Sequence, residues 1–162
     1  MINHWDKPGV PHKGWHCFDV EDLGKPTHTC EMCGQEQIRF VHYMRHLEHR
    51  DLQVGCICAE KMTEDYVNPK LREQALRNKA SRRSRWLSRK WRISAKGNPF
   101  IKVKGNHIVA YPFGQFFRLC INGKMGTINY PTLDAARLRA FDVIEIFAER
   151  NAAANHPKPL CA

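Results

Sequence analysis

The chain has 162 residues, of which 43% are hydrophobic and 26% are charged, and its net charge at neutral pH is +10. This much apolar material can build a core, which excludes a wholly disordered chain, and no run approaches the ~18 apolar residues of a membrane span. The first residues, 1–6, lack the basic start and apolar run of a secretory signal, so we expect a soluble protein of the cytoplasm or nucleoid.

The positive charge is concentrated in one segment. Residues 1–69 have a net charge of −4, residues 70–104 have +12 with Glu73 as their only acid, and residues 105–162 have +2. Clustered cations are typical of a surface that binds a polyanion, because they release counterions from its phosphates. The distribution therefore predicts a nucleic acid as the partner and gives no indication of a membrane.

Residues 1–29 contain many His, Pro and Gly, which indicates an irregular arm packed on the module that follows. The chain has seven cysteines, and four of them form two close pairs, Cys30-x-x-Cys33 and Cys56-x-Cys58. An odd number of cysteines without a signal peptide argues against a secreted disulfide framework. In a reducing compartment, such pairs are usually metal ligands.

The segment between the two pairs predicts a β-hairpin. Residues 37–45 alternate between two faces with the period of a strand, residues 52–54 begin a return strand, and a helix is expected from Ala59. Zn²⁺ prefers four tetrahedral thiolate or imidazole ligands, and a helix N-terminus favours thiolates. Four cysteines leave no open position for catalysis. We therefore expect one structural Zn²⁺ bound by Cys30, Cys33, Cys56 and Cys58.

This order of cysteine turn, hairpin and helix start over residues 29–66 resembles the treble-clef zinc fingers. That family usually has Cys-x-x-Cys as its second pair, whereas this chain has Cys-x-Cys. Another ligand is therefore an alternative to Cys56 or Cys58. The candidates for it are Cys17, His16, His28, His42, His46 and His49.

A second helix is expected from Asn68-Pro69 to about Trp91, because Asn is a favourable N-cap and Pro suits the first helical position. Pairing with Glu73 cannot neutralise the cations of this segment, and two tryptophans are interleaved with them. We expect the helix to contact phosphates. The expected nucleic-acid-binding residues are Arg77, Lys79, Arg82, Arg83, Arg85, Trp86, Arg89, Lys90, Arg92, Lys102, Lys104 and Arg118.

The C-terminal part predicts three short strands and a helix. Strands are expected at 100–103, 107–111 and 115–121, followed by the hairpin signal Asn122-Gly123 and a return segment over 125–130. Thr132 is the expected N-cap of an amphipathic helix that runs from Leu133 to about Arg150.

Residues 111–121 and 127–142 resemble the plant ethylene-response-factor type of DNA-binding domain and its phage and bacterial relatives. The match includes Ala135-Ala136 in the helix and the run Ala140-Phe141-Asp142. The resemblance implies three antiparallel strands that lie in the major groove of DNA, with the helix packed behind them. The cations that the strands of this chain offer are Lys102, Lys104, Arg118 and Lys124.

The expected fold class is α+β. It comprises a zinc-binding module with its arm (1–69), a basic connecting helix (70–97), a β-β-β-α module (98–150) and a flexible tail (151–162). The expected function is binding of nucleic acid, DNA rather than RNA, without catalysis.

Two alternatives to this function stay open. One is an accessory protein of phage or plasmid type that modulates a protein partner. The other is a nuclease of the His-Asn-His kind, with a base such as His42. A nuclease also needs a second metal-holding His or Asn, which residues 59–67 lack.

Overall fold

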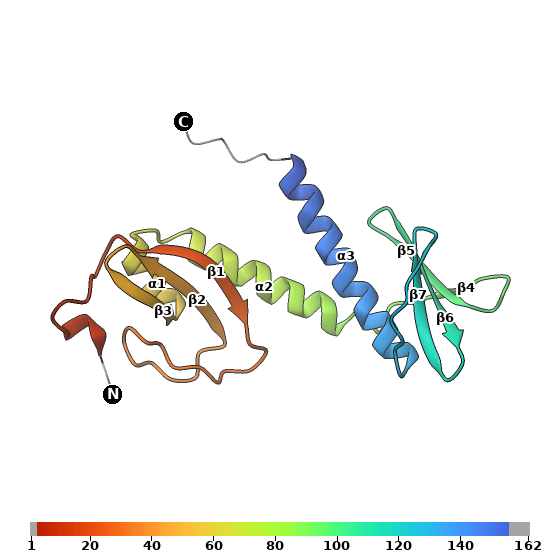
Figure 1. Cartoon of the computed structure of the whole chain (residues 1–162), viewed down its shortest axis with the longest axis horizontal. Helices are drawn as coiled ribbons and strands as arrows, with labels where there is room; N and C mark the ends of the chain where they lie inside the picture. The colour runs from red at the N-terminus through yellow and green to blue at the C-terminus, as the bar shows by residue number, and fades with distance from the viewer. Residues whose placement is uncertain (1–2, 156–162) are drawn as a thin grey trace. The chain divides into compact units, whose positions relative to one another are not determined.

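The computed structural model describes residues 3–155, which form an α+β fold. They divide into two compact units between Ser81 and Arg82 (Figure 1). This boundary lies inside helix α2, Asn68–Ser84, within the expected connecting helix 70–97. None of the helices in the described part of the chain has the length and apolar character needed to cross a membrane. We call the two parts unit 1 and unit 2.

Unit 1 is built on a three-stranded antiparallel sheet in the order β1 (His16–Asp22), β2 (Phe40–His46) and β3 (His49–Val54). A short 3-10 helix, η1 (His4–Asp6), precedes the sheet, and helix α1 (Cys56–Thr63) follows it (Figure 1). Strand β1 corrects the expectation of an irregular arm over residues 1–29. Its sequence, HCFDVED, is too polar to read as a strand, and it forms because its backbone pairs with β2 along one edge.

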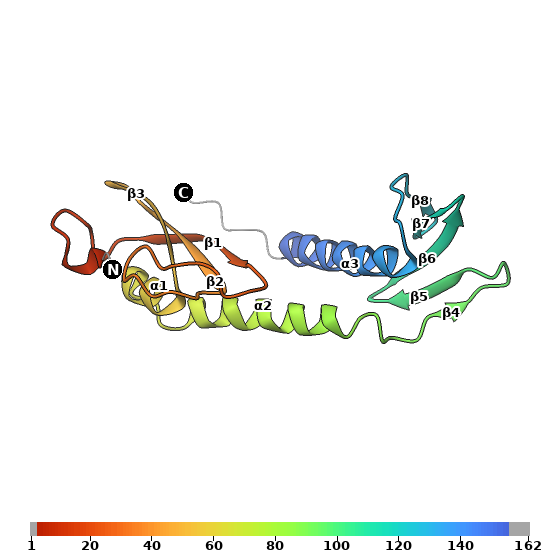
Figure 2. The same cartoon turned by 90° about the horizontal axis from the view of Figure 1, so that it is seen from below.

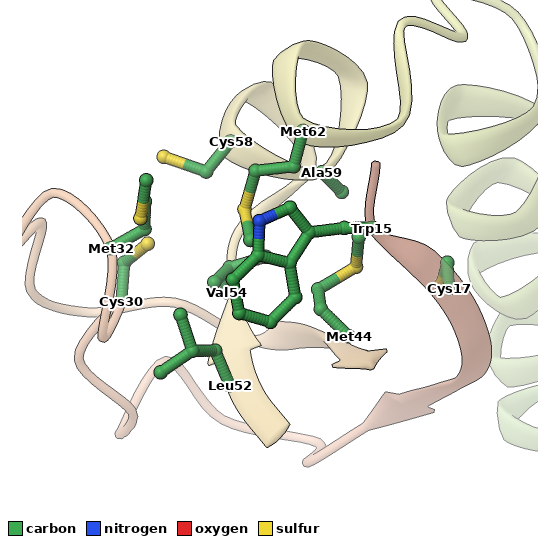
Figure 3. Packing of buried hydrophobic residues seen from close by; sticks show 10 residues of the cluster. All are labelled: Trp15, Cys17, Cys30, Met32, Met44, Leu52, Val54, Cys58, Ala59 and Met62. Carbon is green, nitrogen blue, oxygen red and sulfur yellow. The ribbon is translucent and has the colours of Figure 1, made fainter. Parts of the chain in front are cut away.

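The core of unit 1 is rich in sulfur. Trp15 lies at its centre, and its indole N–H donates to the carbonyl of Pro11 at 2.8 Å (Figure 3). The other residues of the core come from the strands, from the loop between β1 and β2, and from α1. The core therefore joins the sheet to the loop and the helix that contain the cysteine pairs. Its buried members are Trp15, Cys17, Cys30, Met32, Met44, Leu52, Val54, Cys58, Ala59 and Met62.

Unit 2 contains a five-stranded antiparallel sheet whose strands follow one another in chain order. Helix α3 (Leu133–Asn155) packs on it with residues between Ala136 and Glu145, and the rest of the helix continues beyond the sheet (Figure 2). The resemblance implied three strands, so the sheet is larger than expected. The strands are β4 (Arg92–Ile93), β5 (Pro99–Val103), β6 (Asn106–Phe113), β7 (Phe116–Ile121) and β8 (Lys124–Met125).

The turn and the helix cap that the sequence predicts in unit 2 are both present. The turn Asn122-Gly123 has φ values of 52° and 81°, as a type I′ hairpin requires. The Thr132 hydroxyl accepts a hydrogen bond from the backbone N–H of Ala135 at 3.1 Å, which confirms the predicted N-cap. The return strand is shorter than predicted and ends at Met125. At Gly126, which follows it, a Cβ atom would lie only 2.9 Å from the carbonyl oxygen of Leu119.

Two helix lengths differ from the sequence-based expectation. Helix α2 ends at Ser84 instead of near Trp91, because Trp86 and Trp91 are buried in the core of unit 2 and the chain must turn to place them there. Helix α3 continues to Asn155, so residues 151–155 are helical rather than part of a flexible tail. The rest of that tail, 156–162, with Cys161, lies outside the described residues.

Candidate metal centre and basic sheet face

Three of the four predicted zinc ligands lie together. Cys30 and Cys33 come from the loop between β1 and β2, Cys58 comes from the first turn of α1, and their sulfur atoms lie within 4.8 Å of one another. The loop closes tightly because the N–H of Gly34 donates to the carbonyl of Cys30 at 2.8 Å, with Gly34 at a φ of 75° that favours glycine. We call these residues the three-cysteine group.

The three-cysteine group suits a metal ion. Cys30 and Cys58 are buried, and a hydrogen bond with Cys58 lowers the pKa of the Cys30 thiol to about 5 while the same contact raises the pKa of Cys58. The Trp5 indole contributes a hydrogen bond that favours the Cys58 thiolate. Three clustered sulfur ligands are the donors that soft and borderline cations prefer. These residues could therefore bind one metal ion.

Cys56, the fourth predicted ligand, lies in a different group. Helix α1 begins at Cys56, so Cys56 and Cys58 are two helical residues apart and their side chains leave the axis about 200° from one another. The Cys56 sulfur lies instead with His42 on β2 and Glu73 on α2, and the ligand atoms of these three residues are within 4.8 Å of one another. We call His42, Cys56 and Glu73 the mixed group.

Among residues 3–155, none of the alternative ligands joins the three-cysteine group. Cys17 lies at the opposite end of the unit 1 core from Cys30 and Cys58 (Figure 3), with its sulfur 3.9 Å from Nδ1 of His42. His46 and His49 pack against the ring of Trp15. His16 is exposed on β1, and His28 pairs with Ile38 in an isolated β-bridge.

Sequence reasoning missed two residues near these groups. Nδ1 of His4 is buried without a hydrogen-bond partner, while the backbone N–H of His4 donates to Met32, inside the cysteine loop, at 2.7 Å. Glu73 was noted only as the lone acid of a basic segment, yet its carboxylate meets Nε2 of His42 at 3.2 Å. Both contacts join segments about 30 residues apart, and no local sequence signal indicates them.

The surroundings of the mixed group favour the protonated forms of His42 and Cys56. Burial lowers the pKa of His42, but its hydrogen bonds to Cys17 and Glu73 outweigh this effect, so the pKa lies above its ordinary value. Burial, reinforced by the charges of Glu73 and Glu60, raises the pKa of Cys56 to about 11. The thiol of Cys56 is therefore neutral at pH 7 in the absence of a cation.

The basic segment is less available for phosphates than its composition indicated. Arg82 and Lys104 form ion pairs with Glu145 at 2.6 Å and 2.8 Å, and Arg83 pairs with Asp142 at 2.9 Å. In unit 1, Arg77 lies 3.4 Å from Glu73. Of the other predicted residues, Lys79 and Arg85 also interact within the chain, Arg89 lies over the ring of Trp86, and Lys90 is exposed.

Trp86 was expected to contact nucleic acid, but the structure buries it. Its exposed fraction is 3%, its indole N–H donates to the carbonyl of Arg137 at 2.7 Å, and its ring packs on Phe141. Trp86 therefore stabilises unit 2 and offers no surface on which a base could stack.

Other predicted cations lie on one face of the sheet. The strand register turns the buried Ile101, Ile108 and Leu119 toward α3, so residues one position away along each strand face the other side. Arg92 pairs with Phe100, Lys102 with His107, and Tyr111 with Arg118. The outer sheet face, as we define it, consists of Arg92, Phe100, Lys102, His107, Val109, Tyr111, Phe113, Phe116, Arg118 and Cys120.

The outer sheet face mixes cations with aromatic rings. The guanidinium of Arg92 lies 5.5 Å from the ring centroid of Phe100, and that of Arg118 lies 3.5 Å from the ring centroid of Phe113. The ring of His107 packs edge-on against Phe100. Cation–π contacts of this kind hold the guanidinium groups in place on the face. Arg92 is exposed, whereas Arg118 is half-buried and its Nε also donates to Oδ1 of Asn129 at 2.7 Å.

Comparisons of the chain with protein-family models, with curated proteins and with solved structures found no match.

Proposed function

We propose that the chain is a zinc-stabilised nucleic-acid-binding protein in which unit 2 contacts the phosphate polymer through the outer sheet face. The observation that carries this proposal is the alternation of Arg92, Lys102 and Arg118 with aromatic side chains on the side of the sheet opposite α3. Arg binds phosphate through two parallel hydrogen bonds, and aromatic rings can stack on bases.

The net charge of the two units supports this assignment. Unit 2 has 15 Lys and Arg against four Asp and Glu, whereas unit 1 has 11 against 12. Two of the four acids of unit 2, Asp142 and Glu145, already pair with cations of the basic segment. The field of unit 2 is therefore positive, which steers a polyanion toward it. The resemblance to ethylene-response-factor domains favours duplex DNA as that polyanion.

The metal has a structural role in this proposal. Zn²⁺ is the ion that best suits three closely spaced cysteines of a reducing compartment, in a treble-clef-like arrangement of loop, hairpin and helix. Cys30 and Cys33 would hold it from the loop and Cys58 from α1, which would tie the loop to the helix. The ion would stabilise unit 1 and take no part in contacts to nucleic acid.

The salt dependence of DNA binding tests the proposal. In the triple variant Arg92→Gln, Lys102→Gln and Arg118→Gln we expect weaker binding and a salt slope that is flatter by about 0.9 for each lost duplex phosphate contact. The matched control removes three charges elsewhere in unit 2, with Lys96→Gln, Arg139→Gln and Arg150→Gln. Fluorescence anisotropy of a labelled duplex from low to physiological salt measures both.

Equal effects of the two triple variants would show that only net charge matters and would contradict a specific face. An unchanged slope in the first variant, with its circular dichroism intact, would reject the outer sheet face. Competition with single-stranded DNA and with RNA then tests the preference for duplex DNA.

A further inference from the structure

The mixed group joins three different elements at one point. Nε2 of His42 comes from β2, the sulfur of Cys56 from the first residue of α1, and the carboxylate of Glu73 from α2. Their ligand atoms all lie within 4.8 Å of one another, and His42 has no exposed surface. Because the three residues are far apart in sequence, only the packing of unit 1 creates this arrangement.

The mixed group is separate from the three-cysteine group but borders the same cavity. This cavity has a volume of about 520 Å³ and is lined by all three residues of the three-cysteine group, by Cys56 and Glu73 of the mixed group, and by Arg77. His42 lies behind the lining, fully buried. An ion could therefore reach Cys56 and Glu73 from the cavity, whereas His42 would contribute its ligand from the interior.

Neighbouring residues orient the donor atoms. Nδ1 of His42 contacts the sulfur of Cys17 at 3.9 Å, which leaves Nε2 directed at Glu73. The second carboxylate oxygen of Glu73 accepts from Arg77 at 3.4 Å. Metal ligands are commonly held in this way by a second layer of contacts that fixes their orientation. The His42–Glu73 ion pair alone does not explain the position of Cys56. Among the described residues, the only hydrogen-bond partner of the Cys56 sulfur is Oε1 of Glu60, at 4.0 Å.

We propose that His42, Cys56 and Glu73 bind a second divalent transition-metal ion, independently of the three-cysteine group. One nitrogen, one sulfur and one oxygen donor together suit a borderline cation such as Zn²⁺ better than Mg²⁺ or Ca²⁺, which take oxygen donors. On binding, the ion replaces the proton of the Cys56 thiol, and the resulting thiolate and the Glu73 carboxylate balance the charge of the ion. Three protein ligands leave a fourth position for water or a small anion, and the cavity lined by Cys56 and Glu73 offers a path of entry.

Native mass spectrometry of the full chain, reconstituted with excess Zn²⁺, tests this proposal. We expect two ions per chain in the wild type and one in Glu73→Gln, which preserves the shape of the side chain. Cys56→Ser should also bind one ion. The matched control is Glu60→Gln, which makes the same chemical change on a carboxylate near Cys56 and should keep two ions.

Substitution with Co²⁺ gives a second readout. Loss of the second ion, in Cys56→Ser or in Glu73→Gln, should remove one of four thiolate contributions to the near-ultraviolet charge-transfer band. The three contributions of the three-cysteine group should remain in both variants. Backbone amide spectra of each variant show whether unit 1 stays folded.

Several results would overturn the proposal. A wild-type chain that saturates at one ion would place Cys56 in a single four-cysteine site or in none. Two ions in Glu73→Gln, or the loss of one in Glu60→Gln, would reject the assigned carboxylate. Loss of both ions together with the unit 1 spectrum in Glu73→Gln would show that the two groups are not independent.

Discussion

Unit 1 and unit 2 have the same length but differ in the side chains that fill their cores. The core of unit 1 contains three cysteines and three methionines around Trp15, whereas the core of unit 2 contains no sulfur and is formed by two tryptophans, Phe141 and aliphatic residues. Flexible or reactive sulfur-containing side chains specify packing less sharply than rings and branched chains do. The comparison predicts that unit 1 depends on the proposed metal cross-link, whereas unit 2 is stabilised by packing.

Removal of metal should give the largest difference in stability between the two units. We expect a strong chelator, or the variant Cys58→Ser, to unfold unit 1 and leave unit 2 folded, because structural Zn²⁺ contributes about 10–16 kcal/mol in small zinc modules. Two-dimensional amide NMR separates the units, since each has its own set of resonances. Cys120→Ser, in β7 and outside the metal groups, is the control and should change neither unit. A metal-free chain with a dispersed unit 1 spectrum would refute the comparison.

Truncation of a core side chain in unit 2 should destabilise unit 2 and leave unit 1 folded. Phe141 is buried against Trp86, with ring centroids 5.4 Å apart, so Phe141→Ala should destabilise unit 2 by about 3–5 kcal/mol and leave the metal content of unit 1 unchanged. Urea denaturation followed by tryptophan fluorescence and metal release measures both effects. Ile128→Ala, at an exposed position, should have little effect. A parallel loss of metal would mean that the units are not separately stabilised.

The ion pairs of Glu145 should contribute a smaller, pH-dependent part of unit 2 stability. Burial raises the pKa of Glu145, but hydrogen bonds from Lys104 and Arg82 outweigh it, so the folded-state pKa lies below the ordinary 4.5. The stabilisation is therefore complete above about pH 4.5 and is lost as the pH falls through the lower folded-state pKa.

Glu145→Gln tests this contribution. We expect a loss of about 1–2 kcal/mol at pH 7, because both cationic partners are nearly half exposed and partly screened by solvent. Thermal unfolding at pH 7 and at successively lower pH should show the difference from wild type shrinking with acidification. A difference that grows as the pH falls would have the wrong sign and would reject the ion pairs as its source.

The N-cap of α3 should give the smallest effect. Thr132→Ala removes the hydroxyl that accepts from Ala135 and should cost unit 2 about 1 kcal/mol, whereas Thr132→Ser should retain most of the cap. Thermal melts of unit 2 measure both variants. Equal losses in the two variants would point to the lost methyl group instead of the cap.

Features defined by a few neighbouring residues were predictable. The turn at Asn122-Gly123, the cap at Thr132 and the cysteine loop Cys30–Cys33 each depend on contacts within about five residues. Backbone geometry and short hydrogen bonds allow few alternatives at such sites. The division into a cysteine-bearing module and a sheet backed by a helix could also be read from spacing and periodicity.

Features that depend on contacts between distant segments could not be predicted from the sequence. Strand β1 exists because β2 pairs with it, and α2 ends at Ser84 because the two following tryptophans reach a core formed about 50 residues later. Cys56 and Cys58 separate because the helix begins at Cys56, which turns their side chains to different sides and brings Cys56 to His42 and Glu73. Spacing along the chain shows which residues can bind a metal, but the direction of each side chain depends on where an element begins and what packs against it.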